Sequence, residues 1–386
     1  MKNSNFIKNS IIALLPISFA LGVVFATPNE KVEETSAYSF STLPTTITLR
    51  DNSETEIRNY YSALNSKSTS QRKGNDLLIN LKTILSDGQN YFTYDKDSGG
   101  RQIWQMYEIT DRDWAKSPAS AINGTGYGTY NESTKEIVNY VYGTASNPAT
   151  NPYLHSLYVN RDADNPKIAW GYHGSAYREK DERCVEREHI WPKSYGFDES
   201  GAGGARGDPM HLWAADGYAN GLHNNNPYGF VDKSKKYSDS GNNFEFTAGN
   251  ILGKSLNFGN VYTGSVFEPQ DSDKGDIARA CFYMAARYNN LSGKDSSIDS
   301  DNPYLILSDN PSNETGASTS TKSFSLGFVS DLLEWNKLDP VDEYERHRNN
   351  LLFNNYTHNR NPFIDFPQWA DMIWGKSEAS ADPQND

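Results

Sequence analysis

The stretch from Arg187 to Asn226 is the feature that most constrains how this chain can fold. An apolar run, "REHIW", is stopped by Pro192 and followed by a glycine-rich loop, "GFDESGAGGARG". A second apolar run, "MHLWAA", leads into a short helical segment, "DGYANGLHNN", which Asp216 can N-cap and Pro227 ends. This order of strand, loop, strand and helix predicts a compact ββα unit, in which the end of the first strand lies close to the helix.

The rest of the chain predicts an α+β fold, with mixed helices and short strands around this ββα unit. Apolar residues at helical spacing predict helices over 75–88 and 273–288. A third helix is expected to start at Asp339, with Pro340 as its first residue, and to continue to Phe353. Between Gly124 and Asp181, short apolar runs separated by Tyr, Asn, Gly and Ser are typical of short strands joined by long loops.

The N-terminal residues 1–26 are typical of an export signal peptide. Lys2 and Lys8 precede an apolar run from Ile11 to Ala26, which closes with small residues. A retained membrane anchor is the weaker alternative, because Pro16 interrupts a run of 16 residues, short of the roughly 20 needed to cross a bilayer. We therefore expect a secreted protein, extracellular or periplasmic, that has no membrane segment after signal removal.

The remaining segments differ in composition. Residues 27–59 are rich in Ser and Thr and lack a period, which predicts a flexible lead-in. Residues 60–375 are expected to form a single folded domain, and 376–386 a disordered tail. The 36% hydrophobic and 22% charged residues are typical of a globular chain, which we expect to be a monomer. Cys184 and Cys281 allow either one disulfide or two buried thiols.

The charge of the chain limits how it could bind nucleic acid. The formal net charge is −13, and loss of Lys2 and Lys8 with the signal peptide makes it −15. A chain this acidic does not bind phosphate polymers through its overall charge. A nucleic-acid substrate would have to be held by a local basic patch or by a metal ion.

Residues of the ββα unit match the needs of phosphodiester hydrolysis, which requires a base, a metal ion and a group that binds the phosphate. His189 can act as the base, because imidazole titrates near neutral pH. Glu188 and Asn220 supply the hard oxygen ligands that Mg²⁺ prefers, with Mn²⁺ or Ca²⁺ as alternatives. Arg187 and Arg206 are candidate phosphate contacts.

Strand geometry raises an objection to this assignment. Neighbours on a regular strand point to opposite faces, so Glu188 and His189 reach one site only if the strand is irregular, or if they act on different sides of the substrate. A hydrogen-bonded strand end that Pro192 stops would also explain the pair. A transition-metal cluster of His189, His211 and His223 is a further alternative.

The chain also resembles the endonuclease I family of exported bacterial nucleases, in the ββα-metal (His-Me finger) group. The resemblance rests on "REHIWPKSYG" and "GDPMHLWAADGYANGLHNNNPYG", and continues in "VFEPQDSDKGDIARACFYMAARY", "LLEWNKLDPVDEYERHRN" and "HNRNPFIDFP". It covers roughly Tyr60 to Trp374. It implies a non-specific, Mg²⁺-dependent endonuclease with His189 as general base, Glu188 and Asn220 as metal ligands, and products that end in 5′-phosphate and 3′-hydroxyl.

The chain departs from the family pattern at two places near the site. His223 and Asn224 stand where the family often has an Arg-Ser pair, so we take them, with Arg206, as candidate substrate-binding residues. The family's D-L-H-H/N-L pattern appears at 208–212 as "DPMHL", so we carry over only His211, as a supporting residue of the catalytic group beside His189 and Arg187. In the later motifs, the charged and amide residues are expected to cap helices, form salt bridges and fix a turn: Glu268, Lys274, Asp276, Arg279, Asn359, Arg360, Asn361 and Asp365.

Two other functions fit the composition. The 24 Tyr and 8 Trp residues could stack on sugars in an exported glycan- or surface-binding module. A catalytically inactive nuclease-fold scaffold is the second, and the presence of both base and metal ligands disfavours it. We expect DNA as the substrate, with RNA as an alternative.

Overall fold

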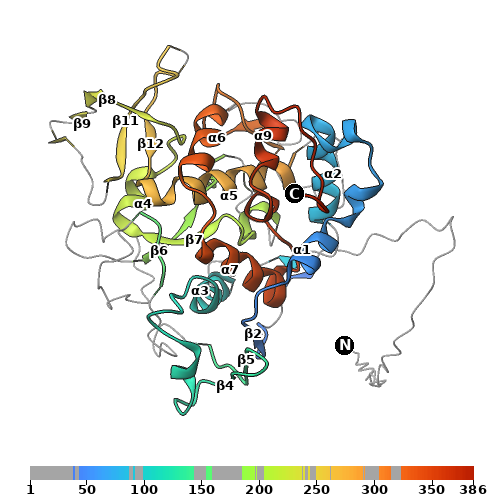
Figure 1. The fold of residues 1–386 in the computed structure, drawn as a ribbon. Coiled ribbons are helices and arrows are strands. Elements are labelled where there is room, and N and C mark those ends of the chain that lie inside the picture. The colour runs from blue at the N-terminus through green and yellow to red at the C-terminus, as the bar shows by residue number, and fades with distance from the viewer. Residues whose placement is uncertain are drawn as a thin grey trace, which may run out of the picture. The chain divides into compact units, whose positions relative to one another are not determined.

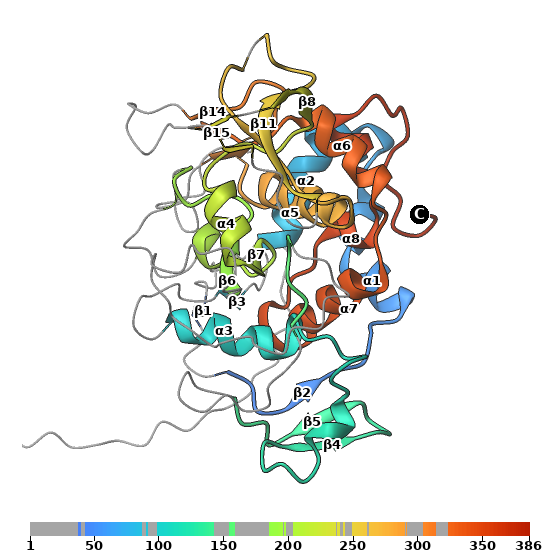
Figure 2. The ribbon, with the colours of Figure 1, turned by 90° about the vertical axis from the view of Figure 1, so that its left-hand side faces the viewer.

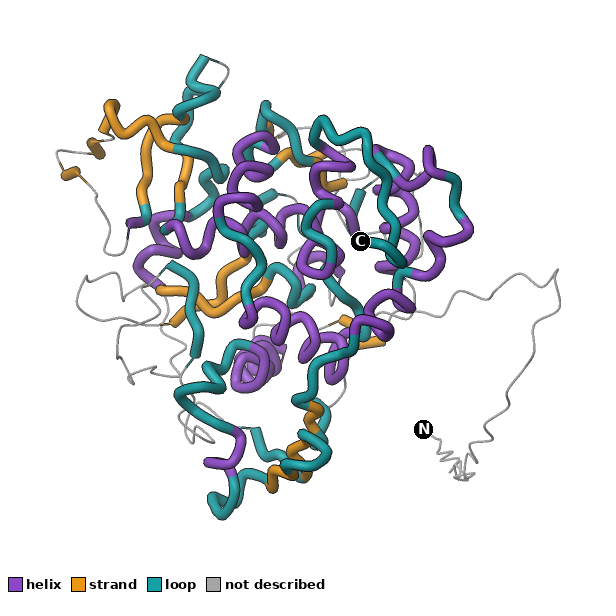
Figure 3. Tube along the Cα trace, viewed as in Figure 1, coloured by secondary structure: helices purple, strands orange, loops and turns teal. Residues whose placement is uncertain are grey.

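A computed structural model describes residues 38–39, 43–86, 90–91, 99–142, 154–158, 185–195, 197, 204–236, 238–239, 242–243, 249–260, 262–289, 291, 304–313 and 323–386. The expected signal peptide, the first part of the lead-in and Cys184 lie outside these residues. The described chain contains helices and small, mostly antiparallel sheets (Figure 3), which confirms the predicted α+β fold class. Within the described residues, none of the helices combines the length and apolar character that a membrane span needs.

The helical elements are α1 (Glu54–Tyr60), η1 (Ser62–Ser66), η2 (Thr69–Arg72), α2 (Gly74–Ser86), α3 (Gly99–Thr110), η3 (Ala119–Ile122), η4 (Gly204–Gly207), α4 (Gly217–His223), η6 (Asp271–Asp273), α5 (Lys274–Arg287), α6 (Val329–Leu338), α7 (Glu343–Leu352), the π-helical turn η7 (Phe353–Thr357), α8 (Pro362–Asp365) and α9 (Trp369–Trp374). The helices predicted over 75–88 and 273–288 are confirmed as α2 and α5.

The strands form small, separate sheets. The pairs are β1 (Tyr38–Ser39) with β3 (Asn90–Tyr91), β6 (Val185–His189) with β7 (Leu212–Asp216), and β9 (Ser238–Asp239) with β10 (Asn242–Asn243). The three-stranded sheets are β2 (Ile47–Thr48), β5 (Glu136–Val138) and β4 (Thr129–Asn131); β12 (Val266–Glu268), β11 (Ile251–Ser255) and β8 (Val231–Lys236); and β13 (Tyr304–Ile306), β15 (Ser323–Ser325) and β14 (Ser312–Asn313).

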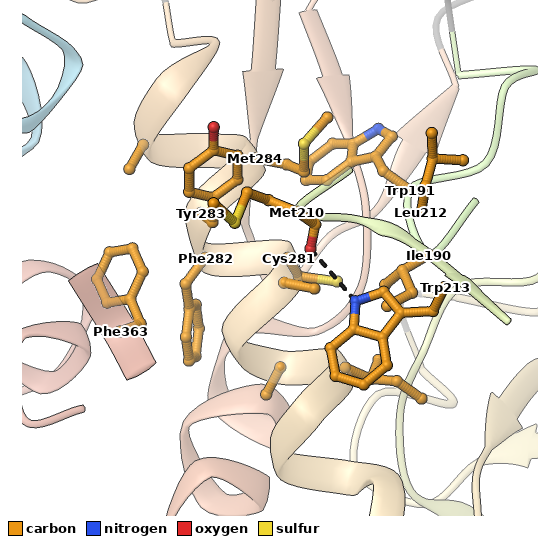
Figure 4. Packing of buried hydrophobic residues seen from close by; sticks show 14 of the residues in the cluster. Ile190, Trp191, Met210, Leu212, Trp213, Cys281, Phe282, Tyr283, Met284 and Phe363 are labelled. Carbon is orange, nitrogen blue, oxygen red and sulfur yellow. Dashed lines mark hydrogen bonds between the residues drawn. The ribbon is translucent and has the colours of Figure 1, made fainter. Parts of the chain in front are cut away.

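Helix α5 lies inside the core, and every residue from Lys274 to Arg287 is buried (Figures 1 and 2). Its side chains connect the ββα unit to the C-terminal helices. Cys281 points toward Trp213 of β7 (Figure 4). Phe282 packs against Phe363 of α8, with the two ring centroids 5.5 Å apart. Burial of each large apolar side chain contributes roughly 1.5–3 kcal/mol. The helix thus supports the β6–β7 pair from the interior of the protein.

The start of α7 differs from the expectation at Asp339 and Pro340. Helix α6 ends at Leu338, and α7 begins only at Glu343, because the Asp342 side chain accepts a hydrogen bond from the Glu345 backbone N–H at 2.8 Å. Pro340 therefore lies in the connection between the two helices. A proline preorganises a first turn, but here the carboxylate cap that follows it sets the helix start.

The structure also gives definite contacts to part of the expected lead-in. Helix α1 begins at Glu54, ahead of the expected domain start at residue 60, and Ser53 and Glu56 form a capping box. Before the helix, the Thr48 backbone N–H donates to Asn355 Oδ1 at 2.6 Å. The Thr48–Asn355 bond joins residues 307 positions apart, so no local pattern in the sequence could indicate it, whereas the capping box is local.

Residues 376–386, expected to be a disordered tail, pack against the domain in the structure. The Asp386 carboxylate accepts a hydrogen bond from Trp369 Nε1 at 2.7 Å. The Ala381 backbone N–H donates to the Arg72 carbonyl at 2.8 Å, and Ala381 is fully buried. Polar composition suggested fraying, but these tertiary hydrogen bonds hold the segment.

Candidate active site

The predicted ββα unit is present in the structure as β6, β7 and α4. Strands β6 and β7 pair antiparallel without a break in register, with Glu188 opposite Trp213 and His189 opposite Leu212. Helix α4 follows β7 directly (Figure 2). Its N-cap is Asp216, whose Oδ1 accepts from the Ala219 backbone N–H at 2.9 Å, as predicted.

The regular register answers the geometric question about the Glu-His pair. Because side chains alternate along a regular strand, Glu186 and Glu188 share one face of β6, while Arg187 and His189 share the other. Hydrogen bonds from α4 to both glutamates identify the first face as the one that packs on this helix. Glu188 and His189 therefore lie on opposite sides of the strand.

Glu188 is the centre of a buried polar cluster and is 2% exposed. Its Oε1 accepts from the Tyr158 hydroxyl at 2.9 Å and from the Tyr228 hydroxyl at 3.3 Å. His223 Nδ1 faces the same oxygen at 2.7 Å. The second oxygen, Oε2, accepts no hydrogen bond from any residue that the structure describes. One oxygen is thus held by its donors, and the other is left for a further partner.

His223 was expected to face the substrate, but the structure places it next to Glu188. The side chain is fully buried and stacks on Tyr228, with ring centroids 4.4 Å apart. Its Nε2 donates to the Asn226 carbonyl at 3.0 Å. A carbonyl only accepts, so Nε2 carries a proton. The lone pair of an unprotonated Nδ1 would then face the carboxylate oxygen of Glu188, so one proton must lie between Nδ1 and that oxygen. His223 therefore fixes the orientation of the carboxylate.

On the opposite face, His189 is held as a neutral imidazole. Its Nε2 lies 3.1 Å from the Arg206 carbonyl oxygen, which can only accept, so Nε2 carries the proton and Nδ1 the lone pair. Burial, together with the electrostatic influence of His211, Lys193 and Arg187, lowers the pKa of His189 well below its usual value. The ring is therefore in the protonation state that a base requires.

His211 supports the same loop. Its Nε2 donates to the Ala205 carbonyl at 2.7 Å, and its Nδ1 faces the Trp191 backbone N–H at 3.4 Å. Burial lowers the pKa of His211 to about 3. The His189 and His211 rings are 5.3 Å apart at their centroids, and both direct Nε2 to carbonyls of η4.

A buried carboxylate anchors this loop to the core. Asp208 accepts hydrogen bonds from the hydroxyls of Tyr283 at 2.8 Å and Tyr288 at 2.9 Å. Asn359 donates in turn to the Tyr283 hydroxyl at 2.7 Å. The "HNRNPFID" segment thus stabilises the loop that carries the Arg206 carbonyl, which agrees with the structural role expected for it.

The other expected site residues lie at different depths. Arg187 shares the His189 face of β6, and its guanidinium lies over the Trp104 ring of α3 at 5.8 Å. Arg206 is only 6% exposed, and its backbone carbonyl oxygen lies 3.1 Å from His189 Nε2. Asn224 is exposed and ends α4 with a positive φ of 51°.

Asn220 lies on the Glu188 face, one turn of α4 before His223. Its Nδ2 donates to Glu186 Oε2 at 2.9 Å, and its Oδ1 accepts no hydrogen bond from the described part of the chain. Glu188 Oε2 and Asn220 Oδ1 are both hard oxygens of the kind that Mg²⁺ prefers, so the donor set fits such an ion. The described residues contain no group of three His, Cys, Asp or Glu that could hold a metal ion, so the histidine cluster is not formed.

Three residues of this arrangement were missed in the sequence. Glu186 could have been found from the strand alternation that separates Glu188 from His189. Tyr158 and Tyr228 carry no comparable signal, because only the tertiary structure brings their hydroxyls, 3.0 Å apart, to Glu188.

The later motifs have the expected structural contacts. Lys274 Nζ donates to Glu268 Oε1 at 2.9 Å, and Arg279 pairs with Glu345 and Asp276 inside the core. Cys281 is buried on α5, and burial raises the pKa of its thiol.

Comparison with known proteins places the chain in a family. The model of the endonuclease I family matches residues 74–368, more than half of the chain. An extracellular ribonuclease of Bacillus subtilis (strain 168) is 39% identical over 188 residues, which are 49% of this chain and 53% of the relative. An extracellular ribonuclease of Bacillus amyloliquefaciens is 37% identical over 188 residues, with the same coverage. The match thus spans about half the length of these relatives, and no solved structure matches.

Because the family model covers residues 74–368, the chain belongs to the endonuclease I family.

Proposed function

We propose that this chain is a secreted, Mg²⁺-dependent, non-specific endonuclease that hydrolyses phosphodiester bonds in DNA, with RNA as an alternative, to 5′-phosphate products. One observation carries the proposal: a single regular strand holds a neutral histidine on one face and an oriented carboxylate on the other. Membership of the endonuclease I family supports it. The names of the two Bacillus relatives support both the nuclease activity and the secretion.

His189 is the general base of this proposal. Its Nε2–H donates to the Arg206 carbonyl, so the ring offers the Nδ1 lone pair to a water molecule and takes a proton from it as the water attacks phosphorus. The lowered pKa of His189 keeps the ring unprotonated at neutral pH. The Arg206 carbonyl then stabilises the ring as it becomes cationic, because Nε2 continues to donate to it.

Glu188 Oε2 and Asn220 Oδ1 would hold the Mg²⁺ ion. When bound, such an ion neutralises charge on the scissile phosphate and on the leaving oxygen. The chain prepares this face by occupying Glu188 Oε1 with His223 and two tyrosine hydroxyls. The opposite placement of Glu188 and His189 suits in-line attack, in which the water and the leaving oxygen lie on opposite sides of phosphorus.

Arg187 is the proposed phosphate contact. It lies on the His189 face of β6, and the Trp104 ring beneath its guanidinium limits its movement. A planar guanidinium can donate two parallel hydrogen bonds to a phosphate. This local charge answers the objection that the chain as a whole is acidic.

A nicking assay tests the proposal. Purified protein and its His189→Ala variant would be incubated with circular double-stranded DNA and with RNA, in Mg²⁺ or in EDTA. General-base catalysis is worth about 10²- to 10⁴-fold, so we expect the variant to lose activity by that factor and EDTA to abolish cleavage. His358→Ala, at an exposed histidine outside the ββα unit whose Nδ1 lies 3.1 Å from the Phe353 carbonyl oxygen, is the matched control. Full activity of the His189 variant would remove the histidine mechanism, and cleavage in EDTA would remove the metal.

The names of the relatives favour one variation of this proposal. Both relatives are called extracellular ribonucleases, so RNA could be the better substrate of this chain. The same assay decides between the two substrates, because the initial rates on DNA and RNA of equal nucleotide concentration can be compared directly.

A further inference from the structure

One carboxylate beside the proposed metal ligands has no role in the mechanism above. Glu186 lies two residues before Glu188, on the same face of β6, and both its side chain and that of Asn220 are partly exposed. Its Oε2 accepts a hydrogen bond from Asn220 Nδ2 at 2.9 Å. Two strand residues and two helix residues thus form parallel pairs: Glu186 with Asn220, and Glu188 with His223.

The first pair determines which end of the Asn220 amide faces the strand. An ionised carboxylate only accepts hydrogen bonds, so the amide NH₂ must face Glu186. The amide oxygen then projects away from Glu186. Divalent cations bind the oxygen of an asparagine and never its NH₂ group, so the orientation of this amide determines whether Asn220 can serve as a ligand.

We propose that Glu186 is a positioning residue that holds the Asn220 amide with its oxygen available to a divalent cation. This inference rests on the proposed metal-dependent function. The terminal torsion of an asparagine is broad and roughly two-fold, so the side chain alone does not select the oxygen. Without Glu186, the next carboxylate on this face is Glu188, which would attract the NH₂ group of Asn220. The two proposed metal ligands would then hydrogen-bond to each other instead of facing the cation.

The alternative role for Glu186 is that of a direct ligand, and the hydrogen bond argues against it. Glu186 already accepts from Asn220 through Oε2, whereas Glu188 Oε2 and Asn220 Oδ1 accept from no residue in the described ranges. The two roles differ in the chemistry that they require. A positioning residue needs only an acceptor oxygen, while a ligand to a hard cation needs the negative charge.

Binding of Mn²⁺ to the full chain without nucleic acid separates these roles, with the unbound ion measured by electron paramagnetic resonance. Glu186→Gln keeps an acceptor without the charge, and we expect its Kd for Mn²⁺ to stay within about threefold of the unsubstituted chain. Glu186→Met and Glu186→Ala remove the acceptor. These two variants should raise the Kd for Mn²⁺ by about tenfold or more. Tenfold corresponds to the lower end of the free energy that a hydrogen bond to a charged group contributes. Glu334→Met, at an exposed acid of α6, controls for loss of charge alone.

Each outcome decides the inference. A Gln variant that binds like the unsubstituted chain, beside Met and Ala variants that bind about tenfold more weakly, supports it. A Gln variant weakened by tenfold overturns it in favour of a ligand or charge role, whether or not the other variants fold. Met and Ala variants that bind normally overturn it while the proposed function stands. An unsubstituted chain that binds no Mn²⁺ at millimolar concentration removes both the inference and the proposed metal dependence.

Discussion

The buried pair between His223 and Glu188 offers a quantitative test of the site geometry. Replacing His223 with alanine removes the contact of 2.7 Å to Glu188 Oε1 and the stacking of the ring on Tyr228. A hydrogen bond to a charged group contributes about 1.5–3 kcal/mol, and an aromatic pair adds about 0.5–1.5 kcal/mol. We therefore expect His223→Ala to lower the free energy of unfolding by roughly 2–4 kcal/mol. Since Tyr158 and Tyr228 still donate to Glu188, the loss should not exceed the about 3–5 kcal/mol of a broken buried ion pair.

The chain contains a matched control for burial. His347 Nδ1 lies 2.8 Å from Asp51 Oδ1, nearly the same distance, but these side chains are 24% and 62% exposed, against 0% and 3% for His223 and Glu188. Exposed pairs of this kind contribute about 0–1 kcal/mol. His347→Ala should therefore lower the free energy of unfolding by no more than about 1 kcal/mol.

Equilibrium unfolding in urea, followed by tryptophan fluorescence, measures both changes. EDTA in the buffer keeps metal binding out of the comparison. The difference between the two variants should be at least about 1 kcal/mol. Equal losses in the two variants would refute the reasoning, because they would mean that burial adds nothing to the Glu188 contact.

Two further predictions concern the acid stability of the loop and the C-terminal segment. Because the pKa of His211 is lowered to about 3, the unfolded chain takes up a proton below its ordinary pKa of about 6.5 while the folded chain does not. The stabilisation from this residue is therefore complete above pH 6.5 and falls as the pH drops. Between pH 7 and pH 5, the free energy of unfolding of the unsubstituted chain should fall by about 2 kcal/mol more than that of His211→Gln. A difference in unfolding free energy between the two proteins that is the same at pH 7 and pH 5 would contradict this. Deletion of residues 376–386 removes the hydrogen bond from Trp369 Nε1 to Asp386, and it should lower the free energy of unfolding by about 1–3 kcal/mol. An unchanged Tm of the shortened chain would show that this segment does not stabilise the domain.

The ββα unit could be predicted from the sequence because its signals are local. Pro192 and the glycine-rich loop break the chain within a few residues, and Asp216 bonds to a backbone N–H only three residues away. The same kind of signal was misread at Pro340, where proline and Asp342 are two competing starts. Only the bond from Asp342 to the Glu345 N–H shows that the second start is used.

Residues at the ends of the domain were harder to predict. The segment before α1 and the tail after Gly375 have no apolar period, so their composition indicated flexibility. Their order comes from single long-range contacts, such as Thr48 with Asn355 and Asp386 with Trp369. A pattern search within either segment cannot detect a partner in another part of the chain.

The sequence by itself predicted that Glu188 and His189 lie on opposite faces if the strand is regular, because side chains alternate along any regular strand; the unbroken register of β6 with β7 shows that it is regular. It also determined that Asn220 and His223, three residues apart on a helix, share a face. Only the tertiary structure decided what each side chain meets there: His223 turns inward to Glu188, Tyr158 and Tyr228 join them, and Glu186 takes the amide of Asn220. The physical reason is that strand and helix periodicity set the direction of a side chain, whereas its hydrogen-bond partner depends on which distant segment packs beside it.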